Sequence, residues 1–212
     1  MSTARNDVVF NKIHSTASSI IDKACEQQRE YLEVSGKKHI REGMPNTLLS
    51  VETDLALWSP PPTGFHKVNF DGAIDMNLKI GAVGFVVSDI AGNIIFVGAR
   101  RFIGMVIPLI IEALALRTSM EEVLSTGLTV VIFEGDCQVL INAINASSSN
   151  DRDVGVVLED IFNLVSRFSE IRFQYVNHKC NWVAHLVAKR ALIDDCFCRS
   201  HHFVMEWLTQ VC

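Results

Sequence analysis

Residues 67–73 have the sequence KVNFDGA, the stretch from which the fold can be worked out. Polar and apolar residues alternate over its first five positions, which is the period of a half-buried β-strand. Two apolar runs follow at residues 80–87 and 94–99, and the turn-forming sequence SDIAGN separates them at residues 88–93. Three strands joined by short turns predict an antiparallel meander.

The chain after the meander shows helical periodicity alternating with two more apolar runs. A helix is predicted from Pro108, whose missing N–H is harmless in a first turn, to about Leu124, and Gly127 ends it. The remaining elements are a buried strand at 128–133, helices at 137–146 and 154–165, a strand at 171–176 and a last helix at 181–192. The order β-β-β-α-β-α-α-β-α predicts an α/β domain.

The segment before the first strand has a different character. Near-helical spacing of apolar residues predicts a helix at about 7–34, so residues 1–57 form an N-terminal helical accessory arm and linker. Three consecutive prolines at 60–62 make a stiff connection, and Trp58 just before them is expected to dock on the following domain. We therefore expect a domain at residues 58–195 and a C-terminal tail at 196–212.

The composition of the 212 residues indicates a globular protein. Apolar residues make up 49% and charged residues 20%, which argues against disorder. The longest uncharged apolar run, residues 102–111, is about half of the roughly 20 residues that a membrane helix needs. We expect no secretory signal, because the first residues show no apolar run or small-residue cleavage site, and we therefore expect the six cysteines to be reduced thiols. We expect an intracellular protein, in the nucleus or cytoplasm, that does not enter a membrane.

Charge is unevenly distributed along the chain. The net charge of −5 discourages a nucleic-acid partner, but residues 111–170 carry ten acids and three bases, whereas residues 171–202 carry five bases and two acids. An acidic block beside a basic block is typical of a cation site next to a phosphate-facing surface. Ordinary solvated faces would give the same pattern.

Three carboxylates adjoin apolar runs. Asp71 ends the predicted first strand, Glu112 lies in the predicted first turn of the helix from Pro108, and Asp136 follows the buried fourth strand. Burying such acids is costly unless an opposite charge compensates, and Mg²⁺ or Mn²⁺ prefers oxygen ligands of this kind. Local alternatives exist for each acid: a turn residue at Asp71, a helix-dipole partner at Glu112 and an N-cap at Asp136.

Six motifs, in this order, resemble a known family. They are WSPPP at 58–62, KVNFDGA at 67–73, GAVGF at 81–85, EALAL at 112–116, EGDC at 134–137 and NWVAHL at 181–186. Together they resemble a type 1 ribonuclease H domain, in the plant group related to retrotransposon-encoded, reverse-transcriptase-like enzymes. The resemblance spans about residues 58–192. It implies a five-stranded mixed sheet of order 3-2-1-4-5 flanked by helices, and cleavage of the RNA strand of RNA–DNA hybrids with two Mg²⁺ or Mn²⁺ ions.

The resemblance also implies the catalytic, metal-binding residues. Asp71 matches the first acid and would bridge both ions, Glu112 matches the helix acid, and Asp136 matches the third acid. The fourth acid of the family lies four residues after an asparagine, and here that position holds His185. The resemblance thus places His185 among the catalytic, metal-binding residues, with one negative charge fewer than the family's acid, so it predicts weaker use of Mg²⁺, a changed metal preference or no activity.

Three further residues are candidates for substrate binding. Gly72 allows a close approach to the backbone, and His178 lies where many relatives carry a loop histidine that assists proton transfer. Asn181 is expected to contact substrate, or alternatively to cap the last helix.

Two functions remain open at this point. The first is a metal-dependent endoribonuclease that acts, as a monomer, on RNA–DNA hybrids, and the set Asp71, Glu112 and Asp136 favours it. The second is a catalytically inactive ribonuclease H-like module, derived from a mobile element, that binds nucleic acid or protein. His185 and the net charge of −5 favour this second function.

Overall fold

This computed structural model describes residues 58–147 and 153–193. The predicted helix at 7–34 and the tail at 196–212 lie outside these residues. Among the helices of the described segments, none combines the length and the apolar character that a membrane crossing requires.

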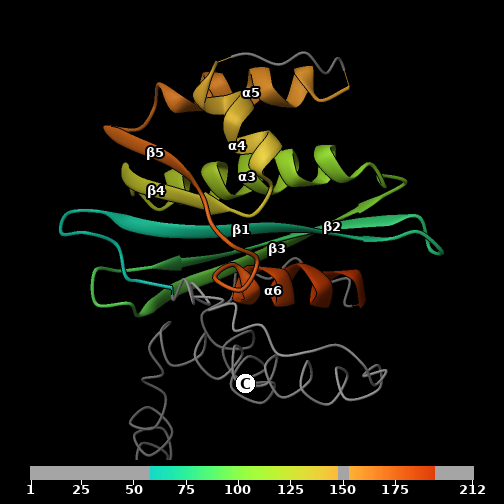
Figure 1. The fold of residues 1–212 in the computed structure, drawn as a ribbon, viewed down its shortest axis with the longest axis horizontal. Helices are drawn as coiled ribbons and strands as arrows, with labels where there is room; N and C mark the ends of the chain where they lie inside the picture. Colours follow the sequence, from blue (N-terminus) through green and yellow to red (C-terminus); the bar gives the residue numbers. More distant parts are fainter. Residues whose placement is uncertain (1–57, 148–152, 194–212) are drawn as a thin grey trace, which may run out of the picture.

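A five-stranded mixed sheet forms the centre of the domain (Figure 1). Its strands are β1 (His66–Asp75), β2 (Ile80–Ser88), β3 (Ile94–Ile103), β4 (Val130–Gly135) and β5 (Glu170–Tyr175). Strands β1, β2 and β3 form the expected antiparallel meander, whereas β4 pairs with β1 and with β5 in parallel. The order β3-β2-β1-β4-β5 confirms the predicted topology.

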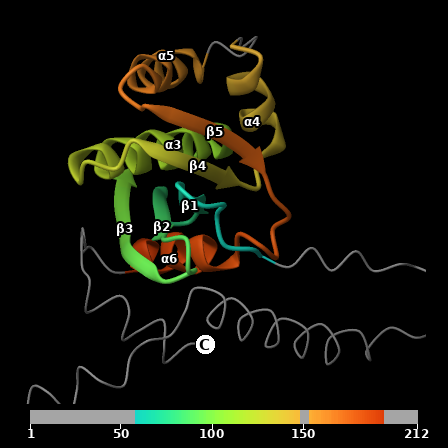
Figure 2. The ribbon, with the colours of Figure 1, turned by 90° about the vertical axis from the view of Figure 1, so that its left-hand side faces the viewer.

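Within residues 58–147 and 153–193, four helices cover the two faces of this sheet. They are α3 (Pro108–Ser125), α4 (Gln138–Asn145), α5 (Gly155–Val165) and α6 (Trp182–Ile193). Figures 1 and 2 show α3, α4 and α5 on one side of the sheet and α6 on the other. This arrangement agrees with the predicted element order, and the long crossovers through helices explain the parallel pairing of β4 with β1.

The sheet separates two hydrophobic cores. The larger core joins the α3 side of the strands to α3, α4 and α5, and its largest fully buried side chains include Phe70, Phe85 and Phe133. The smaller core joins α6 to the other face and includes Trp58, which confirms the expected docking of this residue. Because side chains alternate along β1, Phe70 faces the larger core while its neighbour Asp71 faces α6.

Two glycines allow helices to approach the sheet closely enough to build the site. A Cβ at Gly84 would lie 2.3 Å from the backbone nitrogen of Ala188, so α6 rests directly on β2 at this point. A Cβ at Gly72 would lie 2.5 Å from Cγ2 of Ile111, in α3. The close approach predicted at Gly72 therefore exists, and the group that makes it is a helix of the domain itself.

Candidate active site

Strand register brings two of the predicted acids together. In the parallel pair of β1 and β4, Asn69 lies opposite Glu134. Asp71 and Asp136 each come two residues later, so they leave the sheet side by side on the face that α6 covers. Helix α3 adds Glu112 over Gly72, and one carboxylate oxygen from each acid lies within 4.8 Å of the others. The prediction that these three acids act together thus has a geometric basis.

The local explanations for the three acids are wrong. Strand β1 continues to Asp75, so Asp71 stands inside it and is neither a turn residue nor the last residue of the strand. Glu112 is the fifth residue of α3, beyond the first turn in which it was predicted, and the first turn holds no acid. The N-cap of α4 is Cys137, and no side chain makes a capping hydrogen bond there. The carboxylates are placed by the tertiary structure.

Crowded negative charge makes this site costly without a cation. Burial, together with the charges of Asp71 and Asp136, raises the pKa of the Glu112 carboxyl well above its usual range. Burial also raises the pKa of Asp71, although its hydrogen bond with His185 opposes the effect. Within the described residues, Oε2 of Glu112 is buried and has no hydrogen-bond partner. An oxygen-only donor set with an unsatisfied buried oxygen fits a hard divalent cation such as Mg²⁺ or Mn²⁺.

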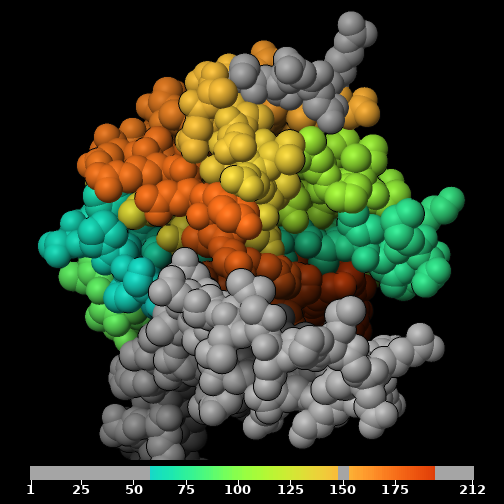
Figure 3. All heavy atoms as spheres, viewed as in Figure 1, coloured from blue at the N-terminus to red at the C-terminus, as the bar shows by residue number. Residues whose placement is uncertain are grey.

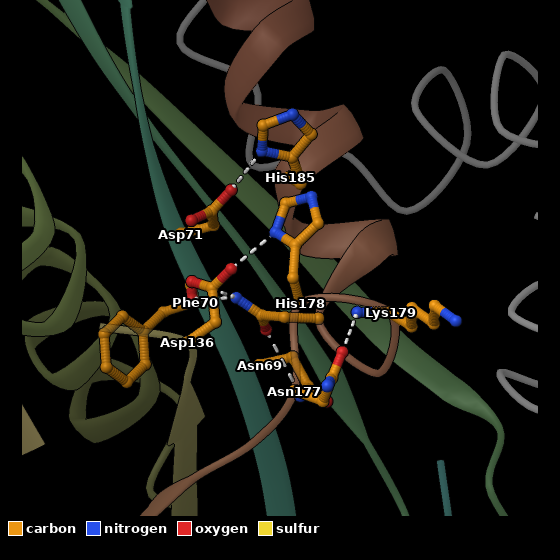
Figure 4. A network of polar contacts seen from close by, with 9 residues as sticks. Asn69, Phe70, Asp71, Asp136, Asn177, His178, Lys179 and His185 are labelled. Carbon is orange, nitrogen blue, oxygen red and sulfur yellow. Dashed lines mark hydrogen bonds and ion pairs between the residues drawn. The ribbon is translucent and has the colours of Figure 1, made fainter. Parts of the chain in front are cut away.

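Two histidines are paired with two of the acids (Figure 4). Nδ1 of His185 shares a hydrogen bond of 2.6 Å with Oδ2 of Asp71, and Nδ1 of His178 shares one of 2.6 Å with Oδ2 of Asp136. The two imidazole rings lie 4.8 Å apart, and His185 stacks on Trp182. In the described residues His185 is a partner of Asp71 and lies outside the group of three carboxylates, so its role as a metal ligand stays a prediction.

Asn181 supports the site from behind. Its side chain is fully buried, and Nδ2 donates to the carbonyl oxygen of Phe70 at 2.8 Å and to Oδ1 of Asp136 at 3.3 Å. It precedes the first residue of α6, and its carbonyl accepts the N–H of His185, as expected at a helix start. No atom of this side chain is exposed for the predicted substrate contact, so Asn181 positions Asp136 instead.

An open cleft of about 510 Å³ gives access to the acids. Gly72 and His178 line it beside the three carboxylates and His185, so these two candidates for substrate contact face the cleft. The loop that follows β5 and carries His178 lies on the surface between α4 and α6 (Figure 3). Cys137 also lines the cleft, and burial raises the pKa of its thiol, which keeps the thiol protonated.

The sequence patterns did not predict a cluster of three buried polar side chains behind the cleft. Lys67 and Asn69 on β1, and Glu134 on β4, are each no more than 5% exposed. The alternation KVNFD carried a signal for them, because the residues two and four positions before Asp71 share its face of the sheet. Because these polar residues alternate with apolar ones, the pattern alone predicts that they face solvent.

Fold and site together define a ribonuclease H-like domain: a sheet of order 3-2-1-4-5 with three clustered acids on β1, on α3 and after β4. The sequence model of the family described as reverse transcriptase-like matches residues 69–191, more than half of the chain. The chain belongs to this family.

Solved structures agree with this assignment. The ribonuclease H1 of the halophilic archaeon Halobacterium salinarum NRC-1 is 26% identical, with a TM-score of 0.58 over 62% of this chain and 99% of its own. The N-terminal RNase H domain of a Mycobacterium tuberculosis protein is 16% identical, with a TM-score of 0.56 over 69% and 97%. LC11-RNase H1, solved in complex with an RNA/DNA hybrid, is 16% identical, with a TM-score of 0.54 over 60% and 99%. No match was found among curated proteins.

Proposed function

We propose that this protein is a metal-dependent endoribonuclease that cleaves the RNA strand of RNA–DNA hybrids. The observation that carries the proposal is the convergence of Asp71, Glu112 and Asp136 within 4.8 Å in an open cleft of a ribonuclease H-like fold. Three acids from three separate elements have no structural need to meet, and burial together with the neighbouring carboxylates raises the pKa of Asp71 and of Glu112, so the meeting is costly. Such perturbed groups in a cleft are typical of functional sites.

The acids would hold the divalent cations, two of them in our proposal. When bound, these cations supply Lewis-acid activation of the attacking water and stabilisation of the leaving 3′ oxygen. Asn181 and His178 keep the Asp136 carboxylate in place by hydrogen bonds to its two oxygens. His178 lies at the rim of the cleft with 45% of its side chain exposed, and in our proposal it would carry a proton between Asp136 and solvent.

The proposed substrate would lie along the cleft and past the start of α6. Gly72 lines the cleft, and exposed Lys179 and Lys189 supply positive charge near the start and on the surface of α6. A hybrid would be distinguished from duplex DNA through the 2′-hydroxyls of its RNA strand rather than through base sequence. With a net charge of −5, binding should be modest and strongly dependent on salt.

A cleavage assay tests the proposal. Purified protein is incubated with a hybrid labelled on its RNA strand, in Mg²⁺ and in Mn²⁺, beside an Asp71→Asn control. We expect cutting of the RNA strand that the control loses. Absence of cutting in both metals by folded protein would refute the endoribonuclease.

One observation favours the second function, an inactive hybrid-binding or protein-binding module. The position of the expected fourth acid is held by His185, and its imidazole forms a hydrogen bond with Oδ2 of Asp71. In the proposed nuclease, this oxygen of Asp71 would instead bind a cation. His185→Asp separates the two functions. If the wild type cuts only in Mn²⁺ and the variant cuts in Mg²⁺, His185 sets the metal preference. If neither protein cuts but both bind the hybrid in an anisotropy titration, the binding module is supported.

A further inference from the structure

A chain of buried polar contacts leads from Trp58 to the site. Nε1 of Trp58 donates to Oδ1 of Asn69 at 3.0 Å, and Nδ2 of Asn69 donates to Oδ1 of Asn181 at 3.5 Å. Nδ2 of Asn181 then donates to Oδ1 of Asp136 at 3.3 Å. Trp58 lies eight residues before β1, outside the segment that matches the family model.

Along this chain of contacts, each hydrogen bond determines which atom of the next amide can donate and which can accept. An indole N–H can only donate, so it requires the oxygen of the Asn69 amide on its side. The amide nitrogen of Asn69 is thereby turned toward Oε2 of Glu134, at 3.1 Å, and toward Asn181. A flipped Asn69 would place its NH₂ against the indole N–H and its oxygen against two other oxygens, and buried polar mismatches of that kind are costly.

The Glu134 end of this arrangement is also held in place. Nζ of Lys67 lies 2.7 Å from Oε1 of Glu134, with both side chains only 6% exposed. The same ammonium donates to the carbonyl oxygen of Ser59 at 2.6 Å and lies 5.2 Å from the centre of the Trp58 ring. The segment at Trp58 and Ser59 is therefore tied to β1 and β4 by charge as well as by packing.

Asn181 receives its orientation from Asn69. Because its oxygen faces the Asn69 NH₂, its own NH₂ faces the Phe70 carbonyl and Asp136. The reverse orientation would set an amide oxygen against the Asp136 carboxylate. We propose that Trp58 is a positioning residue for Asp136, acting through the amides of Asn69 and Asn181. The inference deepens the proposed function, since it adds the segment before the sheet to the parts that prepare the cation-binding acids.

The test uses the full chain with Trp58→Phe, which removes the N–H and keeps an aromatic ring. Val97→Ala is the matched control, because Val97 is fully buried in the same core as Trp58 and takes no part in the polar chain. The first readout is the pair of side-chain NH₂ signals of Asn69 and Asn181 in NMR spectra of the cation-free protein. The second is Mn²⁺ affinity by calorimetry. Partners behind a metal ligand typically contribute about 10- to 100-fold in affinity or activity.

We expect Trp58→Phe to shift both NH₂ signals and to weaken Mn²⁺ binding about tenfold, at the lower end of that range. Val97→Ala should lose stability and change neither readout. In an Asn181→Ala background the effect of Trp58→Phe on Mn²⁺ affinity should disappear, because the two residues act in series. Unchanged NH₂ signals in folded Trp58→Phe, or an undiminished effect in the Asn181→Ala background, would overturn the proposal. Absence of hybrid cleavage by the wild type would refute the nuclease alone, since the NH₂ signals do not depend on catalysis.

Discussion

Replacing Gly84 by alanine should displace α6 and with it one side of the site. The added Cβ would lie 2.3 Å from the nitrogen of Ala188, 2.8 Å from the carbonyl carbon of Val187 and 2.9 Å from the oxygen of Ala184. All three are backbone atoms, so no side-chain rotation relieves the overlap. Ordinary contact begins at 3.4 Å, which requires a retreat of α6 by about 1.1 Å at Ala188.

The retreat acts on His185, which α6 carries. Its 2.6 Å hydrogen bond with Asp71 would lengthen to as much as about 3.7 Å, beyond hydrogen-bond range. Overpacking of this kind costs about 1–3 kcal/mol, and the lost hydrogen bond adds about 1 kcal/mol. Gly84→Ala should therefore lower the free energy of unfolding by about 2–4 kcal/mol. If the protein is a nuclease, a displacement near 1 Å should lower its turnover about 100-fold.

Urea denaturation followed by circular dichroism measures this loss. Gly155→Ala is the matched control, because a Cβ at Gly155, the first residue of α5, meets nothing within 4 Å. That variant should be as stable as the wild type or gain up to about 1 kcal/mol from helix propensity. A Gly84→Ala protein within about 0.5 kcal/mol of the wild type would refute the reasoning, since surface-like changes produce no more than that.

Three other variants test the charges of the site. Glu112→Gln should raise the melting temperature of cation-free protein at pH 7, because the raised pKa of Glu112 means that its ionised form is destabilising. For the same reason the cation-free wild type should gain stability as the pH falls through the raised pKa of folded Glu112 toward 4.5, the ordinary pKa of a glutamate. Melting temperatures measured over a range of pH should show a smaller gain in Glu112→Gln. Mn²⁺ should raise the melting temperature of the wild type but not of Asp71→Asn, and equal shifts would argue against a cation at these carboxylates. Lys67→Met leaves Glu134 buried and uncompensated, so it should cost about 3–5 kcal/mol in urea denaturation. The double variant with Glu134→Gln should recover part of that loss, and an equal or larger loss would contradict the assigned ion pair.

Periodicity and turn-forming residues were sufficient to predict the helices and strands of the domain. The alternation KVNFD and the apolar runs after it predicted β1, β2 and β3, although β1 and β3 each continue four residues further than the patterns indicated. The strands extend because residues beyond the apolar runs, such as Ala73 and Arg101, still find partners in β2. Strand ends are decided by pairing with a neighbour, which a single-strand pattern does not contain.

For the site, too, the sequence was sufficient for the acids but not for the contacts that they make. Asp71, Glu112 and Asp136 could be selected from the sequence, because acids beside apolar runs are unusual and their order matches a known family. The residues that contact these acids could not be identified from the sequence. That His185 pairs with Asp71, that Glu112 has an orphaned oxygen and that Trp58 reaches Asn69 all depend on groups far apart in the chain.

The sequence by itself thus determined the kind and order of the elements, the topology through its family resemblance, and three acids of the site. The elements and their order follow from local spacing, since a residue's place on a strand or helix face depends on its near neighbours. Only the tertiary structure decided which atoms meet. The register of β1 against β4 and the close seating of α6 on Gly84 set those distances. Hydrogen bonds and buried charges change from favourable to costly within about 1 Å, so the chemistry of the site is decided by packing between distant segments.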